Sequence, residues 1–569
     1  MAKTNYWQRF QRQRISRRRL MVGAGVGVAG LAVAAACGDD GGNGASPTST
    51  SVASATATPL PTPKRGGRYQ DVDTVTFDTF DPHLSVAAGP EKFPRVYNVL
   101  VTQSALKPEF IFNDLAESYE APDPGGAEWI FTIRPGVKIG PNPHGVPERD
   151  MDAEDARFSF ERIKNLPGAS AAQFVVDWWA SHEVTDTNIY KVTTKSPYAW
   201  FLLNIGRYIS TTPPREIIEL GGDFMNQNAA GGGPFVLTSI IEGEGLSFDR
   251  NPNYYRTDPN NNNAQLPYVD GFDSRLIPDR ATRRTAFIDG QVYEYGAGNR
   301  AEADDLIANH DVSLTSAVPT FTFIAFTMNV TKPPWDNPLV RKAAMHALNR
   351  QEFVDIVYGG DAQVNGVVHW PTGAFALPPE ELADLQKFDS ELSKELIQQA
   401  GHELPLTIKV VFASGVSTQE IDEHLPIFLG QMEEAGFRIE QDPQDLSTWL
   451  QNYTDKNYDA SLSLNLPYET AEIPLDWQHS KGPAGSDVFT NGIMDAEIDA
   501  LIDGTKSITD PDELVAAVQD VQRRIYEVGP AFLPIASPFS RTLRHNFVKN
   551  WPVGLGATEN IVTDWWLDV

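Results

Sequence analysis

The chain has 569 residues, of which 41% are hydrophobic and 21% are charged, and it contains a single cysteine. This length suffices for several folding units with a large buried core, and the hydrophobic fraction excludes a chain that is disordered throughout. One cysteine excludes a disulfide scaffold and a metal module built on several cysteines. The formal net charge is −29, and so strong an anion repels phosphate groups, which argues against nucleic acid as a partner.

The first 36 residues have the pattern of an export signal. They contain seven Lys and Arg side chains and no acid, so the remaining residues (−29 minus +7) carry a net charge of −36. An uncharged run of small and apolar residues, 20–36, follows the basic stretch, as in an export signal. The sequence Ser-Arg-Arg-Arg-Leu-Met at 16–21 resembles a twin-arginine signal, with Arg17 and Arg18 as the paired arginines. Residues 1–36 are therefore predicted to direct the chain out of the cytoplasm.

The lone cysteine, Cys37, is predicted to carry a lipid anchor. The sequence Ala-Ala-Ala-Cys at 34–37 resembles a bacterial lipobox, in which the cysteine is acylated and becomes the mature N-terminus. Residues 38–64 are rich in Gly, Ser, Thr, Ala and Pro, which is typical of a disordered tether with a reach of roughly 25–30 Å. We therefore expect an anchor and linker over 37–64, with the protein held at the outer face of the cytoplasmic membrane through the lipid alone.

Beyond the linker, strand and helix signals alternate, and no apolar run is long enough to cross a membrane. Residues 129–133 read as a strand that ends at an Arg-Pro-Gly turn. Asp152 is a predicted helix N-cap, and Asn337-Pro338 begins a second helix. Residues 417–435 read as a helix that is followed by a strand at 437–440. The alternation predicts an α/β fold with mixed sheets.

A set of short blocks, in a fixed order, resembles the family 5 extracellular solute-binding proteins, which are the peptide and oligopeptide receptors of bacterial ABC importers. The resemblance covers roughly 65–569. The blocks are Arg-Gly-Gly-Arg at 65–68, Phe-Asp-Pro-His at 80–83, Val-Tyr-Asn-Val-Leu-Val at 96–101, Asp-Leu-Ala-Glu-Ser-Tyr at 114–119, Phe-Thr-Ile-Arg-Pro-Gly-Val-Lys at 131–138, Asp-Ala-Glu-Asp-Ala at 152–156, Gly-Pro-Phe at 233–235, Asn-Pro-Asn-Tyr-Tyr at 251–255, Val-Arg-Lys-Ala at 340–343, Asn-Arg at 349–350, Tyr-Asp at 458–459 and Asp-Ala-Glu-Ile-Asp-Ala-Leu at 495–501.

The resemblance implies a two-lobed periplasmic-binding-protein fold, with an extra domain inserted in the first lobe and a hinge between the lobes. The chain would cross between the lobes twice, which explains why no second linker interrupts it. The expected division is lobe I over 65–108, 235–315 and 537–569, the inserted domain over 109–234, and lobe II over 316–536.

The resemblance also indicates where a ligand would bind. In peptide-binding members, an aspartate that follows a Gly-Trp pair receives the free amine of the peptide, a charge-assisted contact. Counted from Asp459, the Gly-Trp pair falls on Leu464-Asn465 and the aspartate on Tyr468, so the strict pattern is absent. Glu469, one residue later, is the expected substitute, and Glu472 is the alternative.

Two further positions are expected at the ligand. Asn98 falls in the block at 96–101, which resembles the first helix of the family and carries a cleft residue there. Trp370, in the predicted loop 365–374, is the expected aromatic wall, with Tyr468 opposite. The plainer interpretations stay open: a helix-surface hydrogen bond for Asn98, a solvated loop acid for Glu469, and ordinary core packing for the aromatic side chains.

No motif indicates catalysis, since the sequence has no GxSxG elbow, HExxH pair or P-loop, and its histidines lack metal-ligand spacing. The sequence therefore predicts a monomeric binding protein, without cofactor or metal, that captures a peptide or peptide-like solute and delivers it to an ABC permease and its ATPase. Two alternatives remain: a secreted hydrolase that uses a carboxylate pair, and a receptor of the same fold for a sugar, a nickel chelate or haem.

Overall fold

A computed structural model describes the chain over residues 62–74, 77, 79–84, 92–103, 111–122, 126–166, 176, 178–206, 210–221, 223–320, 323–414, 419–465, 470–481, 492–551 and 563–569. The predicted export signal with Arg17 and Arg18, the predicted anchor Cys37 and nearly all of the linker lie outside these ranges. Within them, no helix combines the length and the apolar character that a membrane crossing requires.

The first sheet joins the start of the described chain to a segment about 200 residues later. Its order is β1-β12-β9-β8, in which β1 is parallel to β12 and the other pairs are antiparallel. Arg68 fixes this arrangement, because its guanidinium group donates to Asp273 on β12 and to Asp249 on β9. The strands are β1 (Arg68–Asp73), β8 (Phe235–Ile241), β9 (Gly245–Arg250) and β12 (Gly271–Leu276).

The second sheet is antiparallel, with the order β4-β5-β7-β6, and helix α4 (Ala153–Asn165) packs against it. Phe160 of α4 contacts Trp179, at 4.8 Å between ring centroids. The predicted N-cap is confirmed, since the Asp152 side chain accepts hydrogen bonds from the first turn of α4. The predicted strand at 129–133 is confirmed as β5. The strands are β4 (Ala116–Glu120), β5 (Glu128–Ile133), β6 (Trp179–Asp186) and β7 (Ile189–Thr194).

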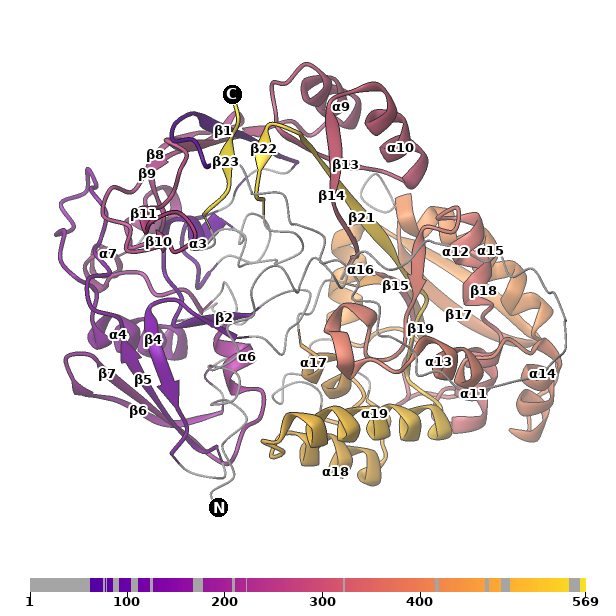
Figure 1. The fold of residues 1–569 in the computed structure, drawn as a ribbon. Coiled ribbons are helices and arrows are strands. Elements are labelled where there is room, and N and C mark those ends of the chain that lie inside the picture. The colour runs from indigo at the N-terminus through magenta and orange to yellow at the C-terminus, as the bar shows by residue number, and fades with distance from the viewer. Residues whose placement is uncertain are drawn as a thin grey trace, which may run out of the picture. The chain divides into compact units, whose positions relative to one another are not determined.

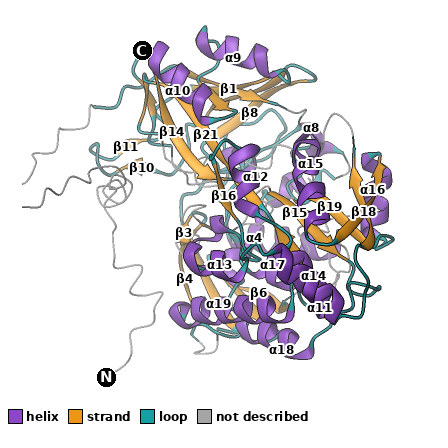
Figure 2. Ribbon diagram, turned by 90° about the vertical axis from the view of Figure 1, so that its right-hand side faces the viewer, coloured by secondary structure: helices purple, strands orange, loops and turns teal. Residues whose placement is uncertain are grey.

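The third sheet is mixed, with the order β18-β17-β19-β15-β20. The first three strands are parallel, and β15 is antiparallel to both of its neighbours. Helix α15 (Gln419–Glu434) packs against β18 and β19 (Figure 2). The core between them includes Phe326, Phe428 and the fully buried Trp335. The strands are β15 (Phe323–Met328), β17 (Leu406–Ala413), β18 (Phe437–Gln444), β19 (Ala460–Asn465) and β20 (Phe532–Pro534).

The fourth sheet is centred on the long strand β21 (Ala536–His545), which pairs with β13 (Glu294–Ala297) and β14 (Val312–Pro319) along one part and with β16 (Ala362–Val364) at its start. Strand β14 leads directly into β15, and β20 leads directly into β21 (Figure 1). The chain therefore passes twice between the third and fourth sheets, which agrees with the two crossings that the family resemblance implies. The domain boundaries given above stay predictions.

The remaining elements are short strands and helices that connect these sheets. They are α3 (Phe93–Val96), β2 (Val101–Gln103), β3 (Ile111–Asn113), α6 (Phe201–Ile205), α7 (Arg215–Glu219), α8 (Phe224–Gln227), β10 (Thr257–Asp258), β11 (Ala264–Gln265), α9 (Arg280–Ile288), α10 (Arg300–Asn309), α11 (Pro338–His346), α12 (Arg350–Ile356), the 3-10 helix η3 (Trp370–Phe375), α13 (Pro379–Leu385), α14 (Ser390–Gln399), α16 (Leu446–Thr454), α17 (Glu472–Asp476), α18 (Ala496–Thr505), α19 (Pro511–Val528), β22 (Val548–Lys549) and β23 (Trp566–Leu567).

A buried triad of Asp81, His83 and Arg162 ties the segment 79–84 to α4. The two guanidinium nitrogens of Arg162 donate to the two carboxylate oxygens of Asp81, a pair whose side chains are 16% and 2% exposed. The same guanidinium donates to Nδ1 of His83 at 2.8 Å, while Nε2 of His83 donates to the Thr211 carbonyl at 3.1 Å. His83 is therefore held as the neutral imidazole, with both ring nitrogens satisfied.

We expect acid to destabilise the fold through His83. Burial, together with the Arg162 cation, lowers the pKa of His83 to about 4. The unfolded chain takes up a proton at this residue near its ordinary pKa of about 6.5, whereas the folded chain does not. Stability is thus lost as the pH falls from about 6.5 towards 4, by about 2 kcal/mol between about pH 7 and about pH 5.

Urea unfolding of the wild type and of His83→Asn at these two pH values measures the effect. The variant should lose the His83 contribution to the pH slope. Identical slopes in the two proteins would show that His83 titrates alike in the folded and unfolded states.

Candidate functional site

The structure describes only part of the predicted ligand site. Tyr468 and Glu469 lie outside the described residues, between the end of β19 and Thr470. Trp370 begins η3, but its side chain also lies outside the described part. The roles of these three residues therefore stay predictions.

Asn98 lies in the interior rather than on a helix surface. Helix α3 ends at Val96, and the backbone turns extended at Tyr97. Asn98 then pairs with Thr212 in an isolated β-bridge, and its Nδ2 donates to Asp114 at 3.1 Å. The side chain is 1% exposed. The block at 96–101, expected as the first helix, is thus mostly the extended approach to β2, and Asn98 stays a predicted ligand residue that the fold already uses.

Three glycines, Gly231 to Gly233, make this packing around Asn98 possible. A Cβ on Gly231 would lie 2.3 Å from the Val96 carbonyl oxygen, and one on Gly232 would lie 2.5 Å from Asn98 Oδ1. Distances this short are far below van der Waals contact, so a side chain at these positions would force the neighbouring residues to move. The glycines are therefore required by space rather than by an unusual φ.

We expect Gly231→Ala to lower the free energy of unfolding by roughly 1–3 kcal/mol, the usual cost of overpacking. Gly296→Ala on β13 is the matched control, because a Cβ there meets no heavy atom within 4 Å. Both free energies come from urea unfolding. A loss at Gly231 no greater than at Gly296 would refute the steric argument.

The strongest polar constellation in the described chain surrounds Glu472, the alternative acid of the sequence analysis. Glu472 is the first residue of α17 and is 1% exposed. Ile473 and Trp477 of the same helix pack with Phe323 and Phe532 of the third sheet. The hydrophobic contacts therefore fix the position of the Glu472 carboxyl group relative to that sheet.

The partners of Glu472 come from a segment far away in the sequence. Tyr198 Oη donates to the Glu472 carboxyl, at 2.8 and 2.9 Å from its two oxygens. Asn204 Nδ2 donates to Glu472 Oε2 at 2.8 Å and to Tyr198 Oη at 2.6 Å. Tyr198 and Asn204 are 0% and 1% exposed. The carboxyl group of Glu472 is thus enclosed by side chains of the protein itself.

An ion pair lies beside this contact. Lys506 Nζ is 2.9 Å from Asp476 Oδ1, and the Asp476 side chain is 1% exposed. Lys506 Nζ also lies 5.2 Å from the centroid of the Trp178 ring, which in turn stacks on Tyr198 at 4.6 Å. The hydrogen-bonded trio Tyr198, Asn204 and Glu472 and the ion pair therefore form one buried cluster.

The electrostatics of the cluster favour a protonated Glu472. Burial and the neighbouring charge of Asp476 raise the pKa of Glu472 to about 8, although the hydrogen bond from Asn204 opposes the shift. Burial also raises the pKa of Asp476, against the attraction of Lys506. Burial disfavours the charged form of Lys506, but Asp476 and Glu472 outweigh it and raise the pKa of Lys506. The polar groups of the cluster thus bind one another.

The family model for the middle part of the bacterial extracellular solute-binding proteins, family 5, matches residues 111–479, well over half of the chain. The chain belongs to this family. The sequence resemblance is thus confirmed over the segment that carries the second sheet, the third sheet except β20, and Glu472. Members of the family are solute-binding proteins, so the alternative of a secreted hydrolase is dropped.

Named relatives of this family 5 protein bind chemically different solutes. The glutathione-binding protein GsiB of Salmonella paratyphi A is 25% identical over 295 residues, which are 51% of this chain and 53% of that protein. The chain thus matches about half the length of this relative. The heme-binding protein A of Haemophilus influenzae is 23% identical over 459 residues, which are 74% of this chain and 78% of that protein.

A solved structure supports the fold of the family 5 protein. The periplasmic binding protein DppA from Helicobacter pylori, in complex with the peptide STSA, superposes with a TM-score of 0.71 at 19% identity. The superposition covers 89% of this chain and 99% of DppA. At this identity the likeness shows the fold, and the predicted two-lobed periplasmic-binding-protein architecture is confirmed.

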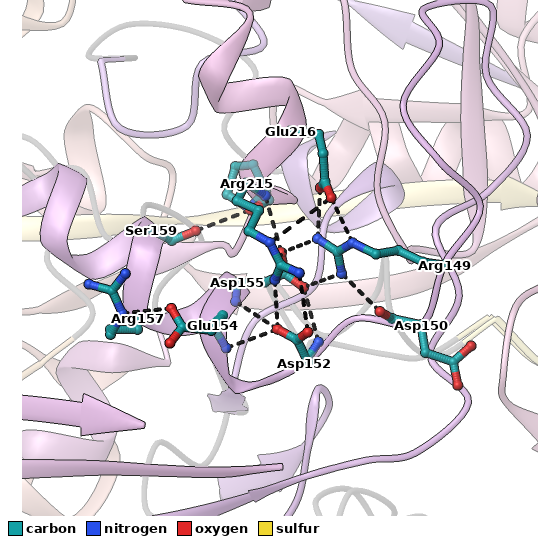
Figure 3. A network of polar contacts seen from close by, with 10 residues as sticks. Arg149, Asp150, Asp152, Glu154, Asp155, Arg157, Ser159, Arg215 and Glu216 are labelled. Carbon is teal, nitrogen blue, oxygen red and sulfur yellow. Dashed lines mark hydrogen bonds and ion pairs between the residues drawn. The ribbon is translucent and has the colours of Figure 1, made fainter. Parts of the chain in front are cut away.

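A second polar network lies at the start of α4, where it stabilises the fold of the family 5 protein and does not form a ligand site. Asp155 is fully buried and accepts from Arg149 and Arg215, while Arg149 also reaches Glu216 (Figure 3). The sequence predicted the start of this helix at Asp152 but not the partners of Asp155. Arg149 lies six residues before Asp155, whereas Arg215 lies 60 residues after it, where no local signal connects the two residues.

Proposed function

We propose that this family 5 protein is an exported lipoprotein that captures a peptide or peptide-like solute between its lobes and delivers it to an ABC permease. Arg17 and Arg18 would direct export, and acylated Cys37 would hold the protein at the outer face of the cytoplasmic membrane. The folded body would act as a monomer. Palmitate labelling that is lost in Cys37→Ser tests the anchor.

The proposal rests on membership in family 5 together with the solutes that the relatives are named for. Glutathione is itself a peptide, and a protein of Pseudomonas aeruginosa named as a di/tripeptide-binding protein is 26% identical over 50% of this chain. DppA holds a peptide in a fold that superposes on nearly all of this one. These likenesses favour a peptide over a sugar or a nickel chelate.

The two passages of the chain between the third and fourth sheets would serve as the hinge on which the lobes close around the solute. A body whose chain passes between the lobes at β14–β15 and at β20–β21 can close by a hinge motion. A solute that contacts both lobes binds the closed form more tightly and therefore increases its population. The permease would then recognise the closed form, and the receptor itself would need no nucleotide.

Glu469 is the proposed acceptor of the free amine of a peptide, because Glu472 is already hydrogen-bonded to Tyr198 and Asn204. We expect Glu469→Gln to weaken the binding of an unmodified peptide about 10- to 100-fold, the worth of a hydrogen bond to a charged group. Calorimetric titration of the full chain, with a peptide selected from a mixed library, measures this loss.

The N-acetylated form of the same peptide is the matched control, since it lacks the ammonium group. It should bind the wild type and Glu469→Gln equally weakly. Equal affinity of both proteins for the unmodified peptide would remove Glu469 from the site, and failure of every peptide to bind would refute the proposed solute class.

Haem is the second candidate solute, because the match to heme-binding protein A covers 74% of this chain. Haemin added to the purified chain would then show a shifted and saturable Soret absorption band. A spectrum equal to that of free haemin would exclude this candidate.

A further inference from the structure

We propose that the contact of Tyr198 and Asn204 with Glu472 is a proton-dependent clasp that holds the two lobes together, independently of the solute. The clasp is defined as these three side chains. It goes beyond solute capture, because it assigns a switch to residues that the proposed ligand site does not use. It rests on the two-lobed fold and on the contacts given below.

Each half of the clasp is rigidly attached to a different sheet. Glu472 belongs to α17, which packs on the third sheet through Ile473 and Trp477. Tyr198 lies three residues before α6 and Asn204 lies within it. Phe201 of α6 stacks on Trp129 of the second sheet, at 5.0 Å between ring centroids. The hydrogen bonds of the clasp therefore join the second sheet to the third across 268 and 274 residues of sequence.

Further contacts surround the clasp along the same boundary. The Ala199 backbone N–H donates to the Lys506 carbonyl at 2.7 Å, next to Tyr198. Trp200 contacts Phe375 of η3 at 5.2 Å between ring centroids. The segment 198–204 therefore touches three separate parts of the opposite lobe: α17, the end of α18 and η3. Separation of the lobes would break all of them together.

The charges that face Glu472 determine how the clasp responds to protons. Asp476 on the same helix repels an ionised Glu472, while Lys506 attracts it but is already paired with Asp476. Tyr198 faces Glu472 as a neutral donor, because burial and Glu472 raise the pKa of its hydroxyl well above the usual value. Burial raises the pKa of the Asp476 carboxyl most, while the nearby charge of His479 lowers it and the charge of Asp503 raises it. Ionisation would thus leave two buried carboxylates with one lysine.

The protonated form fits the geometry, because a hydroxyl group can accept a hydrogen bond as well as donate one. The proton of Glu472 Oε1 can be donated to Tyr198 Oη, which lies 2.8 Å away. Asn204 Nδ2 then keeps its hydrogen bonds to Glu472 Oε2 and to Tyr198 Oη. The burial that raises the pKa of Glu472 to about 8 then favours the closed clasp below that pH.

Hydrogen exchange of the Ala199 amide reports on the clasp directly, because its acceptor lies on the opposite lobe. The full chain is measured without solute between about pH 6 and about pH 9, with rates corrected for intrinsic exchange. For the wild type, protection should fall about tenfold per pH unit between about pH 6 and about pH 8, where the closed form keeps the Glu472 proton and the open form does not, and it should level off above the pKa of Glu472. Glu472→Gln imitates the protonated acid and should keep its protection over the whole range.

Tyr198→Phe supplies the second variant and should lose about tenfold in protection at every pH, because one hydrogen bond of the clasp is gone. The amides of β15 in the third sheet serve as the control for global unfolding and should exchange equally in all three proteins. Identical pH profiles of wild type and Glu472→Gln at Ala199 would overturn the proposal. No solute is present, so this failure is distinct from failure of the peptide titration.

Discussion

Replacing Arg162 by Met is expected to lower the free energy of unfolding by roughly 3–5 kcal/mol, the cost of leaving a buried charge without its partner. Asp81 has a side chain that is 2% exposed, and both of its carboxylate oxygens accept from Arg162. The methionine would also leave Nδ1 of His83 without its donor. Urea unfolding measures the loss.

Arg157→Met on the same helix is the matched control. Among the described residues, Arg157 forms an ion pair with Glu154 alone, three residues earlier, and both side chains are more than a third exposed. A pair of this kind contributes about 1 kcal/mol at most. If Arg162→Met and Arg157→Met cost the same, the buried triad of Asp81, His83 and Arg162 does not stabilise the fold as argued.

Replacing Asp155 by Ala should also destabilise the fold by roughly 3–5 kcal/mol, because two part-buried arginines would lose their shared partner. The carboxylate accepts from Arg149 at 2.6 and 2.8 Å and from the Arg215 backbone N–H at 3.1 Å (Figure 3). It also accepts from the backbone N–H of Asp152, which completes the capping box of α4. Thermal and urea unfolding should agree on the loss.

Glu154→Ala, one residue earlier in the same helix turn, controls for the loss of an acid near the N-terminus of α4 and hence for the helix-dipole effect. Within the described part of the chain, the Glu154 carboxylate accepts a hydrogen bond from Arg157 alone, and we expect a cost of about 1 kcal/mol at most. If Glu154→Ala and Asp155→Ala lowered the free energy of unfolding equally, the loss would come from the helix turn and not from the network of Arg149 and Arg215.

Local structure followed from the sequence because its causes are local. Asp152 and Asn337 were predicted as helix N-caps, and each side chain accepts a backbone N–H of the next turn. The strand at 129–133 and the helix and strand around 417–440 also hold. In each case the deciding contacts span a few residues, so composition and spacing were sufficient.

The partners within the polar clusters could not be predicted from the sequence. Tyr198 meets Glu472 across 274 residues, and Arg162 meets Asp81 across 81. Nothing in either segment alone marks these partners, because any exposed Tyr, Arg or acid has the same local pattern. The resemblance to family 5 predicted the fold and the class of function, but it placed Asn98 in a helix where the chain is extended.

Native mass spectrometry of the full chain, purified from the cells that produce it, tests most directly the central claim that this family 5 protein captures peptide solutes. We expect the protein to carry additional mass that is released on activation and that fragments as a peptide. A chain that shows only its own mass, both as purified and after incubation with a peptide mixture, would contradict the account.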